Sequence, residues 1–101
     1  HSGVIMNLPE KIVRTALKKV LNLSFLPELN EELDQIKEEK SSLLNFISLI
    51  EEEYQVLGMS IPYPVVGKWK KVSDIVTWVR EEDRRLTNIQ ILEVRGTQQR
   101  T

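Results

Sequence analysis

The chain has 101 residues, of which 41% are hydrophobic and 29% charged, and this is the size and balance of one soluble globular domain. Fourteen Lys and Arg oppose fifteen Asp and Glu, and a net charge of −1 argues against binding nucleic acid by bulk attraction to phosphate. Cysteine is absent and His1 is the single histidine, which excludes disulfides, thiolate or histidine metal sites and Ser–His–Asp catalysis. We therefore expect no enzyme, no metal and no redox cofactor.

The first predicted helix begins at Asn7 and Pro9, a capping residue and a first-turn proline, and ends near Asn22. Its apolar residues recur at three- and four-residue spacing, which places them on one face. They are Ile12, Val13, Ala16, Val20 and Leu21. The apolar segment 23–27 has no clear period and predicts a packed loop. A weaker helical stripe follows in an acidic stretch, at Leu29, Leu33 and Ile36.

A second, strongly amphipathic helix is predicted over residues 43–57, with Ser41 or Ser42 as its N-cap and Gly58 as its C-terminal stop. Its apolar positions are Leu43, Leu44, Phe46, Ile47, Ile50, Tyr54 and Leu57. We expect the main core residues to be Leu44, Phe46, Ile47, Ile50 and Ile75.

Pro62 and Pro64 favour an extended path after the second helix. Ser73 is the predicted N-cap of a third main helix that ends near Arg84 or Arg85. Its inward residues are Ile75, Val76 and Val79. In the tail, Ile89 and Ile91 alternate as in a strand, whereas Leu86, Ile89 and Leu92 suit a helix, so both conformations stay open.

These segments predict an all-α fold, a small bundle of three main helices plus one or two short ones. The helical domain spans residues 7–86, between a flexible N-terminal segment, 1–6, and a C-terminal tail, 87–101. No apolar stretch approaches the ~20 residues of a membrane span. We therefore expect a soluble monomer without membrane contact, in the cytoplasm or in an organelle.

The order of the segments resembles the acyl carrier protein family over about residues 8 to 80. Residues 46–54, Phe-Ile-Ser-Leu-Ile-Glu-Glu-Glu-Tyr, followed by Ile61-Pro62, are similar to that family's second helix and following loop. Residues 72–79, Val-Ser-Asp-Ile-Val-Thr-Trp-Val, are similar to its last helix. The resemblance implies an acyl-carrier-like bundle that presents a phosphopantetheine-tethered acyl group to partner enzymes of fatty acid or polyketide biosynthesis.

The family's attachment serine begins the second helix, usually within Asp-Ser-Leu, and this sequence departs from that motif. A gapless alignment with the family that is anchored on residues 51–54 places Lys40 at the serine position. In this alignment the present sequence has three more residues than the family before Ile61. An alignment anchored on Ile61 instead places Ser42, which is followed by Leu43, at the serine position. The present sequence then has one more residue than the family, and Glu52 falls at an inward-facing position.

The resemblance therefore implies Ser42, with Ser41 as the alternative, as the phosphopantetheine-binding residue. Its cargo would be sheltered between the helix over 43–57 and the helix over 73–84. A serine that only caps the helix, without a prosthetic group, is the other interpretation.

Charge is unevenly distributed, because nine acids and two lysines lie between Glu28 and Glu53. Such a run is typical of a solvated face, and the resemblance implies that it meets basic patches on partner proteins. The expected partner-binding residues are Glu38, Glu39, Glu51, Glu52 and Glu53.

The alternative function is a protein-interaction module without a prosthetic group, on a carrier fold or an unrelated bundle. Its apolar contact patch would be Tyr54, Val65, Val66 and Trp69. Trp69 and Trp78 are expected to serve packing. A nucleic-acid module that uses Lys68, Lys70 and Lys71 is opposed by the net charge, and we expect no nucleic-acid partner.

Overall fold

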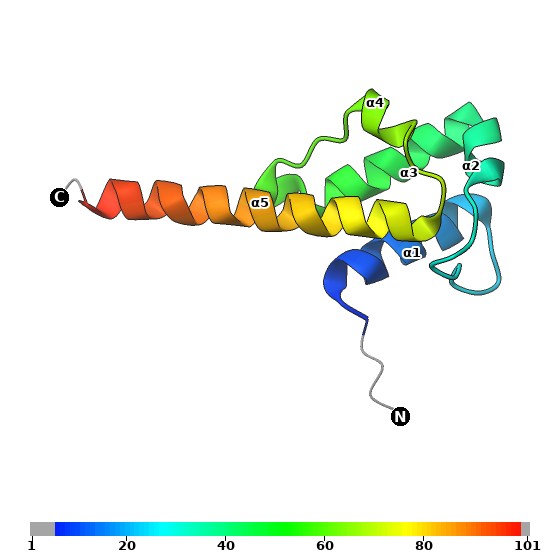
Figure 1. Ribbon diagram of the computed structural model, residues 1–101, viewed down its shortest axis with the longest axis horizontal. Helices are drawn as coiled ribbons and strands as arrows, with labels where there is room; N and C mark the ends of the chain where they lie inside the picture. Colours follow the sequence, from blue (N-terminus) through cyan, green and yellow to red (C-terminus); the bar gives the residue numbers. More distant parts are fainter. Residues whose placement is uncertain (1–5, 100–101) are drawn as a thin grey trace.

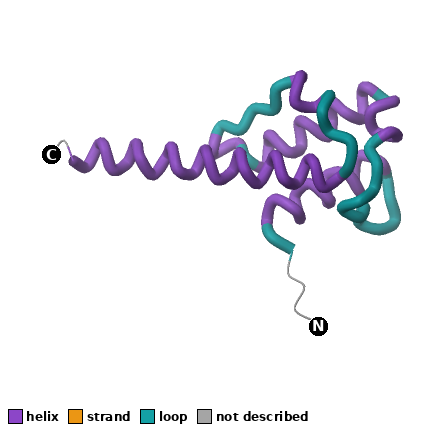
Figure 2. Tube along the Cα trace, in the orientation of Figure 1, coloured by secondary structure: helices purple, strands orange, loops and turns teal. Residues whose placement is uncertain are grey.

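The computed structural model describes residues 6–99 and shows a small all-α bundle, which confirms the predicted fold class (Figure 1). The long helices are α1 (Leu8–Leu21), α3 (Lys40–Glu53) and α5 (Val72–Gln99). The short ones are α2 (Asp34–Glu38), the 3-10 helix η1 (Gln55–Leu57) and α4 (Tyr63–Val66). Figure 2 shows only helices and loops in this part of the chain. The predicted flexible segment 1–6 lies outside the described residues except for Met6.

α1 begins and ends at the residues that the sequence predicts. The Asn7 side chain accepts a hydrogen bond from the Glu10 amide at 2.9 Å, and Pro9 lies in the first turn, where no amide donor is needed. Asn22 ends the helix in the left-handed conformation, with φ 55°. α1 packs against both α3 and α5, so it is the central element of the bundle.

The core is formed mainly by one face of each long helix. Its largest fully buried side chains include Leu17, Ile36, Phe46, Ile50 and Ile75. The prediction that Leu44 belongs to the core is wrong: Leu44 is 46% exposed, whereas Leu43 is 8% exposed. Adjacent helical residues point about 100° apart, and Leu43 rather than Leu44 aligns with the buried residues further along α3.

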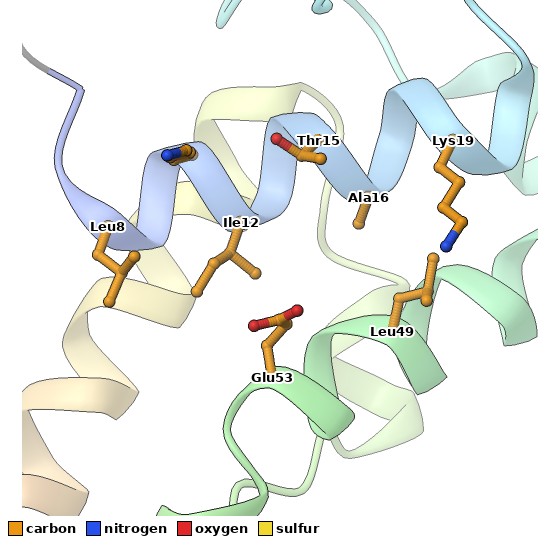
Figure 3. Close-up of a pocket in the computed structure, with 8 residues that line it drawn as sticks. Leu8, Ile12, Thr15, Ala16, Lys19, Leu49 and Glu53 are labelled. Carbon is orange, nitrogen blue, oxygen red and sulfur yellow. The ribbon is translucent and has the colours of Figure 1, made fainter.

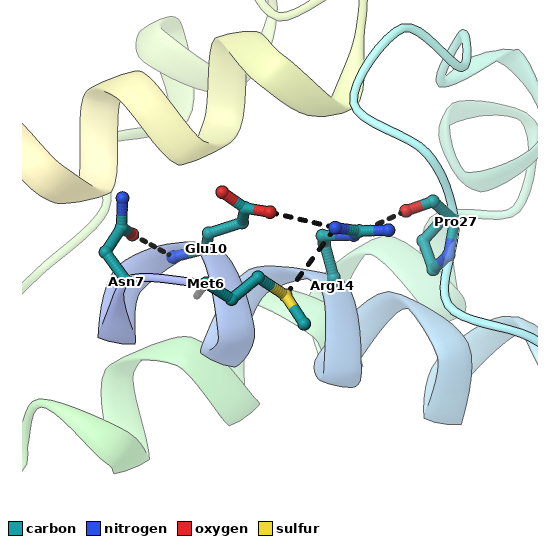
Figure 4. Close-up of polar contacts among 5 residues, drawn as sticks. All are labelled: Met6, Asn7, Glu10, Arg14 and Pro27. Atoms are coloured by element: carbon teal, nitrogen blue, oxygen red, sulfur yellow. Dashed lines mark hydrogen bonds and ion pairs between the residues drawn. The ribbon is translucent and has the colours of Figure 1, made fainter. Parts of the chain in front are cut away.

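Arg14 holds the long loop that follows α1 against the bundle (Figure 4). Its Nε donates to the Pro27 carbonyl oxygen at 2.7 Å, and its Nη1 forms an ion pair with Glu10 at 2.8 Å. Nη1 also lies 3.5 Å from the Met6 sulfur. Pro27 is buried but Phe25 is exposed, so the predicted packing of this loop holds only in part.

The end of the same loop is tied to the start of α5. Backbone hydrogen bonds of 2.8 to 3.0 Å join residues 29–33 to residues 70–73. Of the predicted helical stripe in this region, Leu33 and Ile36 are buried while Leu29 is partly exposed. Only α2 is helical there: Leu29 and Asn30 form a turn, and residues 31–33 pair with the start of α5.

The N-terminus of α5 is capped by Asp74 and not, as predicted, by Ser73. The Asp74 carboxylate accepts hydrogen bonds from the Lys70 and Lys71 amides at 2.9 and 3.0 Å. These two amide donors lower the pKa of the Asp74 carboxyl. α5 already begins at Val72, so Ser73 lies inside its first turn.

Two further predictions about the second half of the chain are wrong. The extended path predicted for residues 61–64 is interrupted at Tyr63, where α4 begins with Pro64 in its first turn. A proline is tolerated there because the first helical amides have no intrahelical acceptor. α5 continues past Arg85 to Gln99, so the expected boundary at residue 86 falls inside a helix, and the tail backbone is helical up to residue 99.

Candidate functional site

The predicted attachment serines lie in the first turn of α3. α2 ends at Glu38, Glu39 is extended, and Lys40 is the first residue of α3. Ser41 and Ser42 are therefore the second and third helical residues, and the prediction that one of them is the N-cap is wrong. Ser41 is exposed and Ser42 is half-buried.

The observed start of α3 agrees with the alignment that counts back from residues 51–54. Glu52, which the other alignment turns inward, is exposed. The three-residue helix η1 lies between α3 and Ile61. It accommodates the three extra residues that the alignment anchored on residues 51–54 requires. By that alignment Lys40 stands at the serine position of the carrier family, and Ser42 lies two residues further along.

A groove runs between α1 and α3 (Figure 3). One part of it has a volume of about 360 Å³. It is lined by Leu8, Lys11, Ile12, Thr15, Ala16, Lys19, Leu49 and Glu53. An adjoining hollow of about 390 Å³ shares Lys19 and Leu49 and is also lined by Val20, Asn45 and Ser48. The groove therefore follows both helices over several turns.

Ser42 lies at one end of the α3 face that lines this groove. Asn45, Leu49 and Glu53 follow Ser42 by three, seven and eleven residues, and this spacing places all four on one side of a helix. With a rise of 1.5 Å per residue, Glu53 lies about 16 Å from Ser42 along the axis. Ser41 is turned about 100° away from this face.

The groove combines an apolar floor with charges at its rim. Ile12, Ala16 and Leu49 supply the floor, and in Figure 3 the Lys19 side chain reaches toward Leu49. The Glu53 carboxylate lies between the two helices in the same view. Such a surface can shelter an extended chain and contact an anionic group at the Lys19 end.

Sequence reasoning missed this groove and expected a shelter between α3 and α5 instead. The core side chains of those two helices are fully or almost fully buried. They include Phe46, Ile50, Ile75 and Val79. The apolar spacing of Ile12 and Val20 was the available signal, but core and groove residues share the same helical period.

The five glutamates expected to meet partners are divided between the two ends of α3, about 20 Å apart. The exposed ones are Glu38, Glu39, Glu52 and Glu53. Glu51 is half-buried and accepts a hydrogen bond from the Ile61 amide at 2.8 Å, so it fixes the chain after η1. The expected acidic surface is therefore two separate patches, without Glu51.

The apolar contact patch of the alternative interpretation does not exist as a surface. Tyr54, Val66 and Trp69 are buried, and only Val65 is half-buried. Trp69 packs edge-on against Trp78 at 6.1 Å between ring centroids, as expected for packing residues.

The buried hydroxyl of Tyr54 lies near Asp83 without a hydrogen-bond partner of good geometry. Burial, followed by the charges of Asp83 and Glu53, raises the pKa of Tyr54 to about 12. This phenol stays protonated at neutral pH and takes no part in the groove.

Three features complete the description of the surface. Lys68, Lys70 and Lys71 are exposed. Within the described residues, no group of three or more His, Cys, Asp or Glu side chains is placed to hold a metal ion. None of the helices described in residues 6–99 is long and apolar enough to cross a membrane.

Comparison with known proteins identifies no relative of this chain. No family model, no curated protein and no solved structure matches the chain.

Proposed function

We propose that this chain is a non-catalytic, acyl-carrier-like domain in which Ser42 carries phosphopantetheine. The α1–α3 groove shelters the arm or the acyl group at its end. The observation that carries the proposal is the position of Ser42 at one end of the helix face that continues through Asn45, Leu49 and Glu53. A chain attached there can lie along the groove, whereas a chain on Ser41 would start about 100° away.

The surroundings of Ser42 suit a phosphodiester in part. The first amides of α3 have no intrahelical acceptor, and the positive end of the helix dipole favours an anion. Lys40 adds a positive charge in the same turn, and Glu38 and Glu39 oppose it. When bound, the arm supplies the thiol for the thioester, and this chain contributes attachment and shelter.

Partner enzymes reach such a carrier through charged surface residues. Glu38 and Glu39 lie beside the start of α3 and next to the proposed arm, so a basic partner surface would be steered to Ser42. Glu52 and Glu53 form a second patch at the far end of the groove. We expect this steering to weaken with added salt.

A second candidate function is an interaction module without a prosthetic group. The observation in its favour is Lys40, which takes the first position of α3, where the resemblance places a serine.

Intact-mass measurement decides between the two functions. The chain is co-expressed with a promiscuous phosphopantetheinyl transferase beside a control carrier. We expect one phosphopantetheine increment on the wild-type chain and on Ser41→Ala, and none on Ser42→Ala.

Neither serine is the N-cap of α3, so both variants should keep the wild-type circular dichroism spectrum and melting temperature. A wild-type chain that stays unmodified while the control is fully loaded refutes the carrier and leaves the interaction module. Loading of Ser42→Ala but not of Ser41→Ala would refute the groove argument.

A further inference from the structure

The length of the α1–α3 groove matches the length of a phosphopantetheine arm on Ser42. Ser42 and Glu53 lie on one face of α3, about 16 Å apart along the helix axis. About 14 bonds separate the serine oxygen from the sulfur of the arm, and an extended chain advances about 1.2 Å per bond, so the sulfur reaches about 17 Å. An arm laid along the groove therefore ends beside Glu53.

The side chains along the groove suit an amide-containing arm better than an alkyl chain. Asn45 and Ser48 of α3 share one hollow with Lys19 of α1, and Thr15 of α1 lines the other part of the groove. These side chains are exposed. They can exchange hydrogen bonds with the amides and the hydroxyl of the arm. An alkyl chain on the same path would cover them without replacing their hydrogen bonds to water.

The far end of the groove is charged. Lys11 of α1 and Glu53 of α3 line it, and Figure 3 shows the Glu53 carboxylate between the two helices. A long alkyl chain that continued beyond the sulfur would either take these charges out of water or extend into solvent, and both are unfavourable. A short polar acyl group avoids both.

We therefore propose that the groove holds the arm along its whole length, and that the cargo of this carrier is a short polar acyl group at the Glu53 end and not a long alkyl chain. This inference rests on the proposed function and deepens it by naming the class of cargo. Such a group bears a hydroxyl, amino or carboxyl substituent, with which Lys11 or Glu53 can form a hydrogen bond or an ion pair.

Melting temperatures of chains loaded with alkyl groups of different length test the proposal. A phosphopantetheinyl transferase attaches the arm from S-alkyl coenzyme A analogues that run from methyl to dodecyl, and intact mass confirms each attachment. The bare arm should raise the melting temperature above that of the unmodified chain, because it contacts only the folded state. Longer alkyl groups should add nothing. An arm without effect, or a melting temperature that climbs with alkyl length, refutes the proposal.

Glu53→Leu should change the class of cargo that the groove accepts. The far end of the groove becomes more apolar in this variant, so a dodecyl group should raise the melting temperature above that given by the bare arm. Glu52→Leu is the matched control: Glu52 is exposed and is turned about 100° from Glu53, so its alkyl series should stay as flat as that of the wild type. Equal gains in the two variants, or no gain in Glu53→Leu, contradict the role given to Glu53.

Amide NMR shifts locate the arm and its alkyl group. Attachment of the arm should shift the resonances of Thr15, Asn45 and Leu49, which line the groove. The buried Phe46 and Ile75 should keep their shifts along the alkyl series. Shifts at these two residues that grow with alkyl length would place the chain between α3 and α5 and overturn the proposal. A wild-type chain that is never loaded refutes the carrier function itself, whereas a loaded chain with length-dependent stability refutes only this inference.

Discussion

Leu43 and Leu44 are adjacent leucines in the first turns of α3, and substituting each by alanine tests how this helix is rotated in the bundle. The chemical change is identical at the two positions, and only the environment differs: Leu43 is 8% exposed and Leu44 is 46% exposed. The stability difference between Leu43→Ala and Leu44→Ala therefore reports their burial.

The magnitudes follow from the buried fractions. A buried carbon is worth about 0.8 kcal/mol, so the three carbons lost contribute about 2 kcal/mol at Leu43 and about 1 kcal/mol at Leu44. Leu43→Ala also leaves a cavity in the core, which adds about 1 kcal/mol. We expect losses of about 3 kcal/mol for Leu43→Ala and at most about 1 kcal/mol for Leu44→Ala.

Urea unfolding followed by the fluorescence of the buried Trp69 and the half-buried Trp78 measures both values. The unfolding free energy should fall with urea concentration at the same slope in both variants, so that the unfolding midpoints can be compared directly. Equal losses at the two positions, or a larger one at Leu44, would refute the reasoning. α3 would then be rotated, and the face that begins with Ser42 would not line the groove.

The remaining predictions concern two groups whose pKa differs between the folded and unfolded chain. Amide donors lower the pKa of Asp74, so its stabilising effect is present above the unfolded value and is lost as the pH falls through the folded value. Asp74→Asn should therefore flatten the acid limb of a melting temperature against pH profile, and an unchanged limb would contradict the cap. Tyr54 has its pKa raised to about 12 from 10.0, so stability should fall as the pH rises through this interval. Tyr54→Phe should remove that alkaline loss and keep neutral-pH stability at or above wild type, because the buried hydroxyl has no hydrogen-bond partner; marked destabilisation at neutral pH would show that it has one.

The candidate site could be predicted only as a short list of serines. The sequence places Ser41 and Ser42 near the start of a helix, but it leaves the first helical residue open because any of several polar residues can precede the apolar stripe. The structure places that start at Lys40, since Glu39 is extended. It also uses Glu51 for a hydrogen bond to Ile61, a contact between distant residues that no local pattern encodes.

The sequence by itself determined the elements whose causes are local. The caps of α1 at Asn7 and Asn22 each depend on the chemistry of one or two residues. Gly58, with φ 73°, is a left-handed stop as expected, but it ends η1, because α3 already ends at Glu53 and not at residue 57 as predicted. The helical period of the apolar residues in turn determined the all-α class.

The tertiary structure decided everything that depends on neighbours from other parts of the chain. Packing of α3 in the core selects Leu43 over Leu44, and the contact between α1 and α3 leaves a groove beside Leu49. The extent of α5 was likewise undetermined, because Ile89 and Ile91 fit a strand as well as a helix until the rest of α5 is seen. A hydrophobic period shows that a side chain avoids water, but the residues that cover it are set by the arrangement of the helices.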